Sequence, residues 1–143
     1  MGEAREPMHR EVGESGMKEA RVLIVDDSAV MRKIVERALR QAGLDPLLVH
    51  EAGSGTEGLE VLGTCVVDLI LSDINIPSMD GLEFVRRIRA QKLACGVPVV
   101  MITTESSEEH VKQAIEAGAR GYIRKPFTPE QVKERVLPLL GLL

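Results

Sequence analysis

The stretch Arg21-Val22-Leu23-Ile24-Val25-Asp26-Asp27 is a short, largely β-branched apolar run that ends on two carboxylates. Three later runs have the same form, and they end on Asp73 (run 68–72), Thr103 (run 99–102) and Lys125 (run 121–124). Runs of this length and composition are typical of strands. Because helical patterns rather than tight turns separate them, the runs are predicted to form a parallel sheet.

The segments between the runs carry helix signals. Ser28 is placed to cap a first helix that Gly43 would end. The apolar face of this helix is expected to comprise Met31, Ile34, Val35, Ala38 and Leu39. A second strand is expected over 47–51 and a second helix over 56–62, and Thr128-Pro129 is typical of a helix start. These strand–helix units predict an α/β fold with a doubly wound, five-stranded parallel sheet.

The carboxyl ends of parallel strands lie along one edge of the sheet, in the crevice where open α/β sheets bind ligands. We therefore expect that edge to gather Asp26, Asp27, Asp73, Thr103 and Lys125. Three neighbouring carboxylates repel one another and raise at least one pKa unless a cation neutralises them. Hard oxygen ligands with room for water and phosphate favour Mg²⁺ over Ca²⁺. The residues thus predict a cation site beside a nucleophile.

The order and spacing of these residues, with Pro77, Asp80-Gly81 and Lys125-Pro126, resemble the receiver domain of bacterial two-component response regulators. The resemblance runs from about Ala20 to the C-terminus. It implies a flavodoxin-like strand order of 2-1-3-4-5, a signalling phosphoprotein rather than an enzyme, and a histidine kinase as the phosphoryl donor. A cytoplasmic location is expected separately, because no secretory signal is recognisable.

The resemblance also assigns roles at the sheet edge. Asp73 would accept the phosphoryl group, and Lys125 would meet the charge on its oxygens. Mg²⁺ would be held by Asp27, Asp73 and the backbone carbonyl of Asn75, with Asp26 acting largely through water. The peptide bond between Lys125 and Pro126 would be cis, as in the family.

Four residues would govern the signal, again by resemblance. Thr103 would bond to a phosphoryl oxygen and move with Tyr122, the aromatic residue that switches the surface. Asn75 and Glu105 would flank the path of the attacking water and tune the lifetime of the phosphate. The output would be docking on a downstream protein target or, in an intermediate phosphocarrier of a phosphorelay, transfer to a histidine phosphotransfer protein.

Each residue alone has an ordinary explanation: a turn aspartate, a surface lysine, a capping threonine. Residues 53–58 also spell G-x-G-x-x-G, the dinucleotide-binding pattern. That pattern belongs in the first strand–helix turn, which here carries Asp26 and Asp27, whose charge would repel a pyrophosphate. An aspartate-nucleophile phosphatase would instead need Asp-x-Asp at the first strand.

Composition argues against several other classes of protein. With 18 Lys and Arg against 22 Asp and Glu, the net charge of -4 argues against a nucleic-acid surface. No apolar run approaches the roughly 20 residues of a membrane span. Cys65 and Cys95 are isolated and are predicted to be buried or partly buried free thiols. Residues 1–19 are expected to be a disordered leader, or sequence upstream of a start at Met17, ahead of a receiver domain at 20–143.

Overall fold

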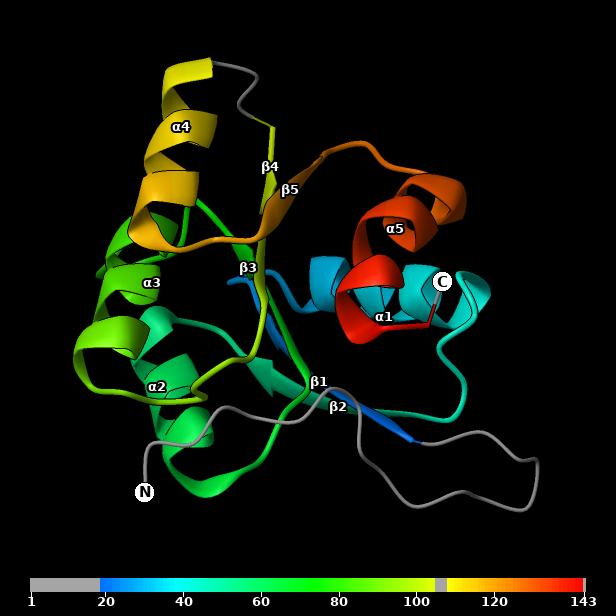
Figure 1. Cartoon of the computed structure of the whole chain (residues 1–143), viewed down its shortest axis with the longest axis horizontal. Coiled ribbons are helices and arrows are strands. Elements are labelled where there is room, and N and C mark those ends of the chain that lie inside the picture. Colours follow the sequence, from blue (N-terminus) through cyan, green and yellow to red (C-terminus); the bar gives the residue numbers. More distant parts are fainter. Residues whose placement is uncertain (1–18, 105–107, 143) are drawn as a thin grey trace.

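The structure is a computed structural model that describes residues 19–104 and 108–142. In these residues strands and helices alternate along the chain (Figure 1). The strands are β1 (Ala20–Val25), β2 (Leu47–Ala52), β3 (Leu69–Asp73), β4 (Val99–Thr103) and β5 (Gly121–Arg124). The helices are α1 (Ala29–Gln41), α2 (Gly55–Thr64), α3 (Gly81–Ala90), α4 (Glu108–Ala117) and α5 (Pro129–Val136), followed by the 3₁₀ turn η1 (Pro138–Leu140).

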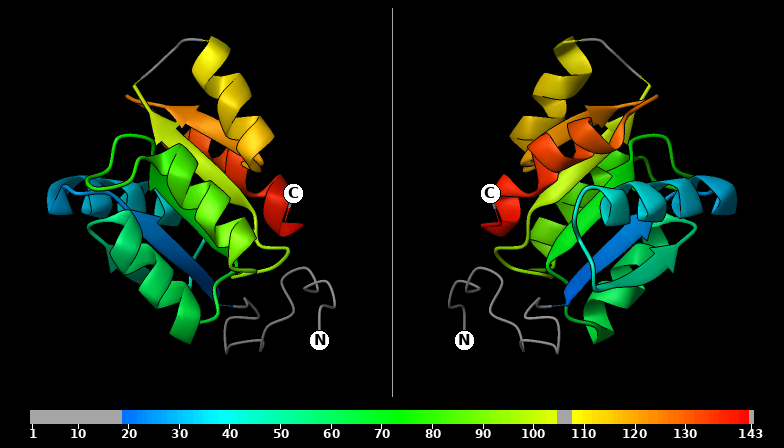
Figure 2. Two further views of the ribbon diagram at one scale, coloured as in Figure 1. Left: turned by 90° about the vertical axis from the view of Figure 1, so that its left-hand side faces the viewer. Right: turned by 90° about the vertical axis from the view of Figure 1, so that its right-hand side faces the viewer.

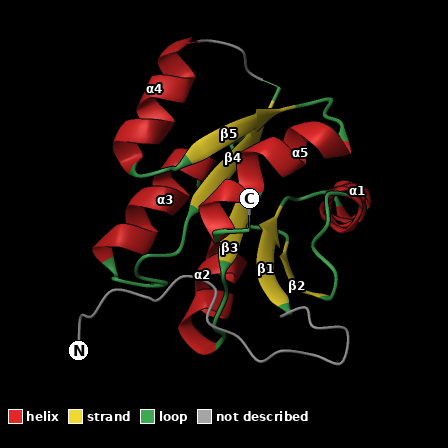
Figure 3. Cartoon of the chain, turned by 45° about the vertical axis from the view of Figure 1, so that its right-hand side comes forward, coloured by secondary structure: helices red, strands yellow, loops and turns green. Residues whose placement is uncertain are grey.

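The strands form one parallel sheet in the order β2-β1-β3-β4-β5, which confirms the predicted topology. Helices α1 and α5 cover one face, and α2, α3 and α4 cover the other (Figures 1 and 2). Seen from a third direction, the strands remain sandwiched between the two groups of helices (Figure 3). The chain passes from the β2 side of β1 to its β3 side, so the switch point of the sheet lies between β1 and β3.

The sheet has a hydrophobic layer on each face. Leu39 of α1 and Val136 of α5 pack in the layer on one side, and Phe84 of α3 packs in the layer on the other. Every residue of β3 is buried, as expected for a central strand covered by helices on both faces. This rigid centre fixes where the strand ends lie.

The first helix forms largely as its sequence indicates. The Ser28 hydroxyl accepts a hydrogen bond from the Met31 amide at 3.1 Å, and Gly43 adopts the left-handed backbone conformation just beyond the helix. The placement of Ile34 on the buried face is wrong, because its side chain is 47% exposed. Ile34 lies at the flank of the stripe formed by Val35, Ala38 and Leu39, where no neighbouring element covers it.

The two cysteines differ in burial. Cys65 is partly buried, as predicted, but Cys95 is exposed because it lies in the loop between α3 and β4. Both thiols are free. Within the described ranges, no helix is both long and apolar enough to cross a bilayer. The expected leader lies outside the described residues apart from Glu19.

Candidate functional site

Four of the expected residues lie at the carboxyl ends of neighbouring strands. Asp26 follows β1, Asp73 ends β3, Thr103 ends β4 and Lys125 follows β5. The Lys125 ammonium reaches back across β4, with Nζ 2.9 Å from Oδ2 of Asp73 and 3.5 Å from Oδ2 of Asp26. The parallel topology therefore brings one ammonium group between two carboxylates that are remote in sequence.

The acidic pair divides into a buried and an exposed residue. Asp26 is only 4% exposed, whereas the side chain of Asp27 is exposed to solvent. Oδ1 of Asp26 accepts a hydrogen bond from the Ser28 amide at 2.9 Å. Burial raises the pKa of Asp26, and the charge of Asp73 adds to this, while the Ser28 amide and Lys125 oppose it. Asp26 is thus a carboxylate whose charge needs a cation nearby.

Both carboxylate oxygens of Asp73 have partners. Oδ1 accepts a hydrogen bond from the Asn75 amide at 3.0 Å, and Oδ2 accepts one from Lys125. The Asn75 side chain is exposed in the loop that follows β3. Asp73 is 9% exposed, so the carboxylate is oriented by the protein and is largely but not fully shielded from solvent.

Lys125 is held in its charged form. Burial by itself lowers the pKa of a lysine, but the hydrogen bond and charge of Asp73, with the charge of Asp26, outweigh burial and raise the pKa of Lys125. The ammonium group is therefore a fixed positive charge at the edge of the sheet. The Lys125–Pro126 peptide bond is cis, as predicted.

Arg32 also belongs to this edge, although no sequence signal pointed to it. Its Nη1 donates to the backbone carbonyl of Asp26 at 2.6 Å, and its Nε donates to Oε1 of Glu51, near the end of β2, at 2.8 Å. The hydrogen bond from Arg32, with help from Lys33, lowers the pKa of Glu51 although partial burial opposes it. Arg32 thereby ties α1 to the ends of β1 and β2 and braces the turn that carries the acidic pair.

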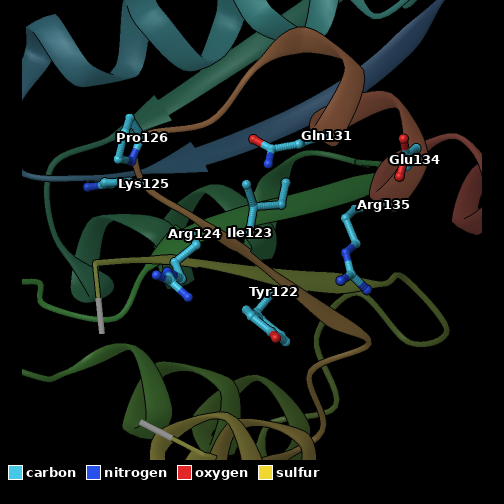
Figure 4. Close-up of a pocket in the computed structure, with 8 residues that line it drawn as sticks. All are labelled: Tyr122, Ile123, Arg124, Lys125, Pro126, Gln131, Glu134 and Arg135. Carbon is cyan, nitrogen blue, oxygen red and sulfur yellow. The ribbon is translucent and has the colours of Figure 1, made fainter. Parts of the chain in front are cut away.

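Thr103 and Tyr122 lie on the same face of adjacent strands. Tyr122 pairs with Met101, and Thr103 pairs with Arg124, so Tyr122, Arg124 and Thr103 all face the α3 and α4 side. Thr103 is buried, and Tyr122 is partly buried. Figure 4 shows Tyr122 and Arg124 on one side of β5 and Ile123 on the other.

A cavity of about 440 Å³ lies where β5 meets α5 (Figure 4). Residues 122–126 line it from the strand side, and Gln131, Glu134 and Arg135 line it from α5. The Arg135 guanidinium carbon lies 5.4 Å from the centre of the Tyr122 ring, within range of a cation–π contact. The cavity thus extends from Lys125, at the carboxylates, to Tyr122. Glu105 lies outside the described residues.

The oxygen donors at this edge suit Mg²⁺ in kind. In residues 19–104 and 108–142, no three His, Cys, Asp or Glu side chains come together as a metal cluster. The predicted gathering of the Asp26, Asp27 and Asp73 side chains is therefore not seen as a three-carboxylate cluster, and Asp27 points to solvent. Asp26 and Asp73 supply hard anionic oxygens in mutual repulsion, which is the environment that Mg²⁺ relieves.

The G-x-G-x-x-G pattern at 53–58 has a packing explanation. A β-carbon on Gly55 would lie 2.5 Å from the Cγ of Met79, and one on Gly58 would lie 2.9 Å from the ring of Phe84. Both glycines lie on α2, where it packs closely against α3 and the loop before it. Close helix packing therefore accounts for these two glycines.

Comparison with known proteins identifies the family. The model of the response regulator receiver domain matches residues 22–137, and the chain belongs to this family. It is thus a CheY-like receiver domain, from a family that works by phosphorylation-dependent signalling and generally uses Mg²⁺.

Individual proteins that resemble this chain are also CheY proteins. The chain is 40% identical over 122 residues to a chemotaxis protein CheY homolog of Campylobacter jejuni, covering 85% of this chain and 92% of that protein. It is 38% identical to chemotaxis protein CheY1 of Helicobacter pylori, covering 85% and 97%. The chemotaxis response regulator CheY4 of Vibrio cholerae superposes with a TM-score of 0.76 at 37% identity, covering 86% of this chain and 100% of that one.

Proposed function

We propose that this chain is a switch in a two-component system in which Asp73 accepts a phosphoryl group from a phosphohistidine of a histidine kinase. The observation that supports this best is the placement of the Lys125 ammonium 2.9 Å from Asp73 and 3.5 Å from Asp26. A largely buried carboxylate with a fixed cation beside it suits attack on an anionic phosphorus centre. The site works in the cytoplasm, where histidine kinases obtain their phosphate from ATP.

The transfer step is a displacement at phosphorus. A carboxylate oxygen of Asp73 forms the new O–P bond, the P–N bond to the donor imidazole breaks, and the histidine leaves with that electron pair. Lys125 stabilises the charge on the phosphoryl oxygens, and the Thr103 hydroxyl donates to another of them. Asp27, Asp73 and the carbonyl of Asn75, with Asp26 through water, would hold Mg²⁺, which would supply further positive charge there.

Intact-mass measurement tests the acceptor. Incubation with acetyl phosphate and Mg²⁺ should add one phosphoryl group to the wild type and none to Asp73→Asn. Asp45→Asn, which changes an exposed aspartate just before β2, at the end of the sheet opposite to Asp73, should gain the group at the wild-type rate. Phosphorylation of Asp73→Asn at the wild-type rate would place the acceptor elsewhere.

Phosphorylation changes the binding surface formed by α4, β5 and α5. On phosphorylation, Thr103 moves toward the phosphate and vacates space behind β4, and the Tyr122 ring, on the same face of the sheet, turns inward to fill it. Tyr122 gives up its contact with Arg135 in that movement, which reshapes the cavity between β5 and α5. A downstream protein then binds the altered surface.

Thr103→Ala tests the coupling. The variant should accept phosphate on Asp73, because the nucleophile and Lys125 remain, but its Tyr122 NMR signals should stay at their resting positions. Beryllofluoride serves as the phosphate mimic, and Thr104→Ala, at the exposed neighbouring position, is the matched control. A full Tyr122 response in Thr103→Ala would overturn the coupling.

Asn75 and Glu105 set the lifetime of the phosphate in this proposal. The Asn75 backbone already contacts Asp73, and its exposed side chain lies where water would approach. Substitution of either side chain should change the rate of dephosphorylation more than the rate of phosphorylation. Equal changes in both rates would indicate a general disturbance of the site instead.

Transfer onward to a histidine phosphotransfer protein is a second candidate. Val30 and Ile34 of α1 are 71% and 47% exposed, close in sequence to the acidic pair, and provide an apolar surface for a helical protein that presents a histidine. A relay would lose the phosphate rapidly to such a protein, whereas a docking switch would keep it and bind a target stably. Phosphotransfer profiling against the histidine kinases and phosphotransfer proteins of the same organism separates the two.

A further inference from the structure

A cavity of about 310 Å³ lies at the end of the sheet opposite to the carboxylates. The loop between α3 and β4 and the loop between α4 and β5 form most of its wall. Arg120, which lines it, precedes β5 and donates its amide to the carbonyl of Val99 at the start of β4 at 2.8 Å. The lining residues therefore place the cavity at the amino ends of the strands, on the side of the sheet covered by α3 and α4.

The charged side chains that line this cavity all carry positive charge. They are Arg89, Lys92 and Arg120, and no carboxylate lines the cavity with them. Within the described part of the chain, none of the three makes an ion pair, whereas Arg21, Arg32 and Arg87 each pair with a carboxylate. Three unpaired cations are thus concentrated in one place on a chain whose net charge is -4.

The cavity is held in shape by contacts within its own loops. The Arg89 side chain lies directly against Gly118, so closely that a β-carbon there would collide with the guanidinium group. The Leu93 amide bonds to the Ile88 carbonyl at 3.0 Å, and the Val97 amide bonds to the Ala94 carbonyl at 3.0 Å. One guanidinium group and the loop that carries Lys92 are therefore positioned before any ligand arrives.

One wall of the cavity is apolar. Ile88 is buried, and Leu93 and Val97 are partly buried against the core on the α3 side. The C-terminal end of a helix favours a nearby cation, and this helps to explain why Arg89 lies in the last turn of α3. Lys92 and Arg120 follow the C-terminal ends of α3 and α4 by two and three residues, beyond the last helical turn in which that effect is strongest.

We propose that this cavity binds a small organic anion that has an apolar body and two or more phosphate or carboxylate groups. The planar guanidinium groups of Arg89 and Arg120 match phosphate and carboxylate oxygens, and Lys92 adds a third charge. The volume of the cavity, about 310 Å³, lies at the lower end of the range of small-molecule sites. This binding is independent of Asp73 and of the proposed phosphorylation.

Cys95 provides a local reporter, because its exposed thiol lines the same cavity. The full chain with Cys65→Ser has Cys95 as its single thiol, since the sequence contains two cysteines. The rate at which Cys95 reacts with the neutral reagent dithiodipyridine is measured in EDTA against rising inorganic pyrophosphate or citrate. These two probes distinguish phosphate from carboxylate recognition.

The proposal requires saturable protection of Cys95 by at least one probe, well beyond that given by sodium chloride of equal ionic strength. Lys92→Gln and Arg120→Gln should each raise the half-protecting concentration about fivefold, the factor expected for one charge near 4 Å in water. Arg86→Gln removes an exposed cation of α3 that does not line the cavity, and it should leave protection unchanged. Thermal melts confirm that the variants are folded.

Three results would overturn the proposal. The first is equal protection by sodium chloride, and the second is wild-type protection in both Lys92→Gln and Arg120→Gln. The third is an equal loss in Arg86→Gln, which would reduce the effect to the general charge of the surface. Protection that survives Asp73→Asn would distinguish this site from the phosphorylation site.

Discussion

The carboxyl edge of the sheet and the cavity at its amino edge carry opposite charge arrangements. At the carboxyl edge, two buried carboxylates share Lys125, and Arg32 is paired with Glu51. At the amino edge, three cations line a cavity that has no carboxylate in its wall. The overall charge of -4 conceals this separation. Net charge therefore predicts little about ligands, whereas the position of each charge along the strands predicts which ions an edge attracts.

The largest expected effect concerns metal binding at the carboxyl edge. Asp27→Ala should weaken Mg²⁺ binding about a hundredfold, because it removes a proposed ligand, and even outer-shell changes cost 10- to 100-fold. Tyr122 is the only tyrosine in a chain without tryptophan, so its fluorescence can follow the titration. Glu60→Ala, at an exposed position on α2, is the control. An unchanged titration in Asp27→Ala would remove Asp27 from the metal site.

The next prediction concerns packing beneath Asp73. A β-carbon on Gly81 would lie 2.6 Å from the Cε of Met101 and 2.7 Å from the carbonyl oxygen of Asp73. Gly81→Ala should therefore lower the free energy of unfolding by about 2 kcal/mol. Gly63 has no atom within 4 Å of such a β-carbon, so Gly63→Ala should be neutral or stabilise by about 0.5–1 kcal/mol. Urea unfolding of both variants measures the difference, and equal stability would mean that the Asp73 edge is loosely packed.

The sequence predicted the carboxyl edge much better than the amino edge. Asp73 and Lys125 are recognisable because each ends an apolar run, and parallel pairing then brings them to one edge. Arg32 and Glu51 meet only because α1 packs across the end of β2, and no local pattern encodes that crossing. Ile34 was misplaced for a related reason, since burial depends on what covers a position as well as on its helical phase.

The cationic cavity had no counterpart in the sequence pattern. Arg89, Lys92 and Arg120 come from a helix end and two loops, and they meet only after α3 and α4 pack side by side. In sequence, each is an ordinary surface cation. Strand ends are constrained by hydrogen-bond register, whereas loop geometry depends on local turns that the apolar pattern does not determine.

A matched pair of substitutions compares paired with unpaired cations. Arg32 is 17% exposed and donates to the Asp26 carbonyl and to Glu51, so Arg32→Gln should cost about 1.5 kcal/mol of unfolding free energy. Arg120→Gln removes an exposed cation without an ion pair among the described residues and should change stability by less than about 0.5 kcal/mol. Thermal or urea unfolding of the two variants provides the comparison. An equal loss in both variants would show that the contacts of Arg32 add nothing to the fold.

The smallest expected effect concerns the cost in stability of burying the charged Asp26 carboxylate at the carboxyl edge. Burial raises the pKa of Asp26, so the folded chain holds that proton more tightly than the unfolded chain does. Stability from this group is therefore greatest below the ordinary aspartate pKa of 3.8 and falls as the pH rises through the raised pKa. In EDTA at about pH 7, Asp26→Asn should then be more stable than the wild type and should unfold at a higher Tm.

The same reasoning fixes the pH dependence of that difference. The difference in stability between Asp26→Asn and the wild type should shrink as the pH is lowered from about 7 to about 4. The wild-type carboxyl then takes up its proton and becomes neutral like the asparagine. Asp27→Asn is the matched control, since its exposed side chain avoids the desolvation that Asp26 undergoes, and its stability should stay near that of the wild type. If Asp26→Asn is instead less stable at neutral pH, the contacts of the carboxylate with Ser28 and Lys125 outweigh the cost of burying it. The carboxyl edge would then be a stabilised ion-pair network, and the repulsion that makes it a cation site would have to come from Asp27 and Asp73.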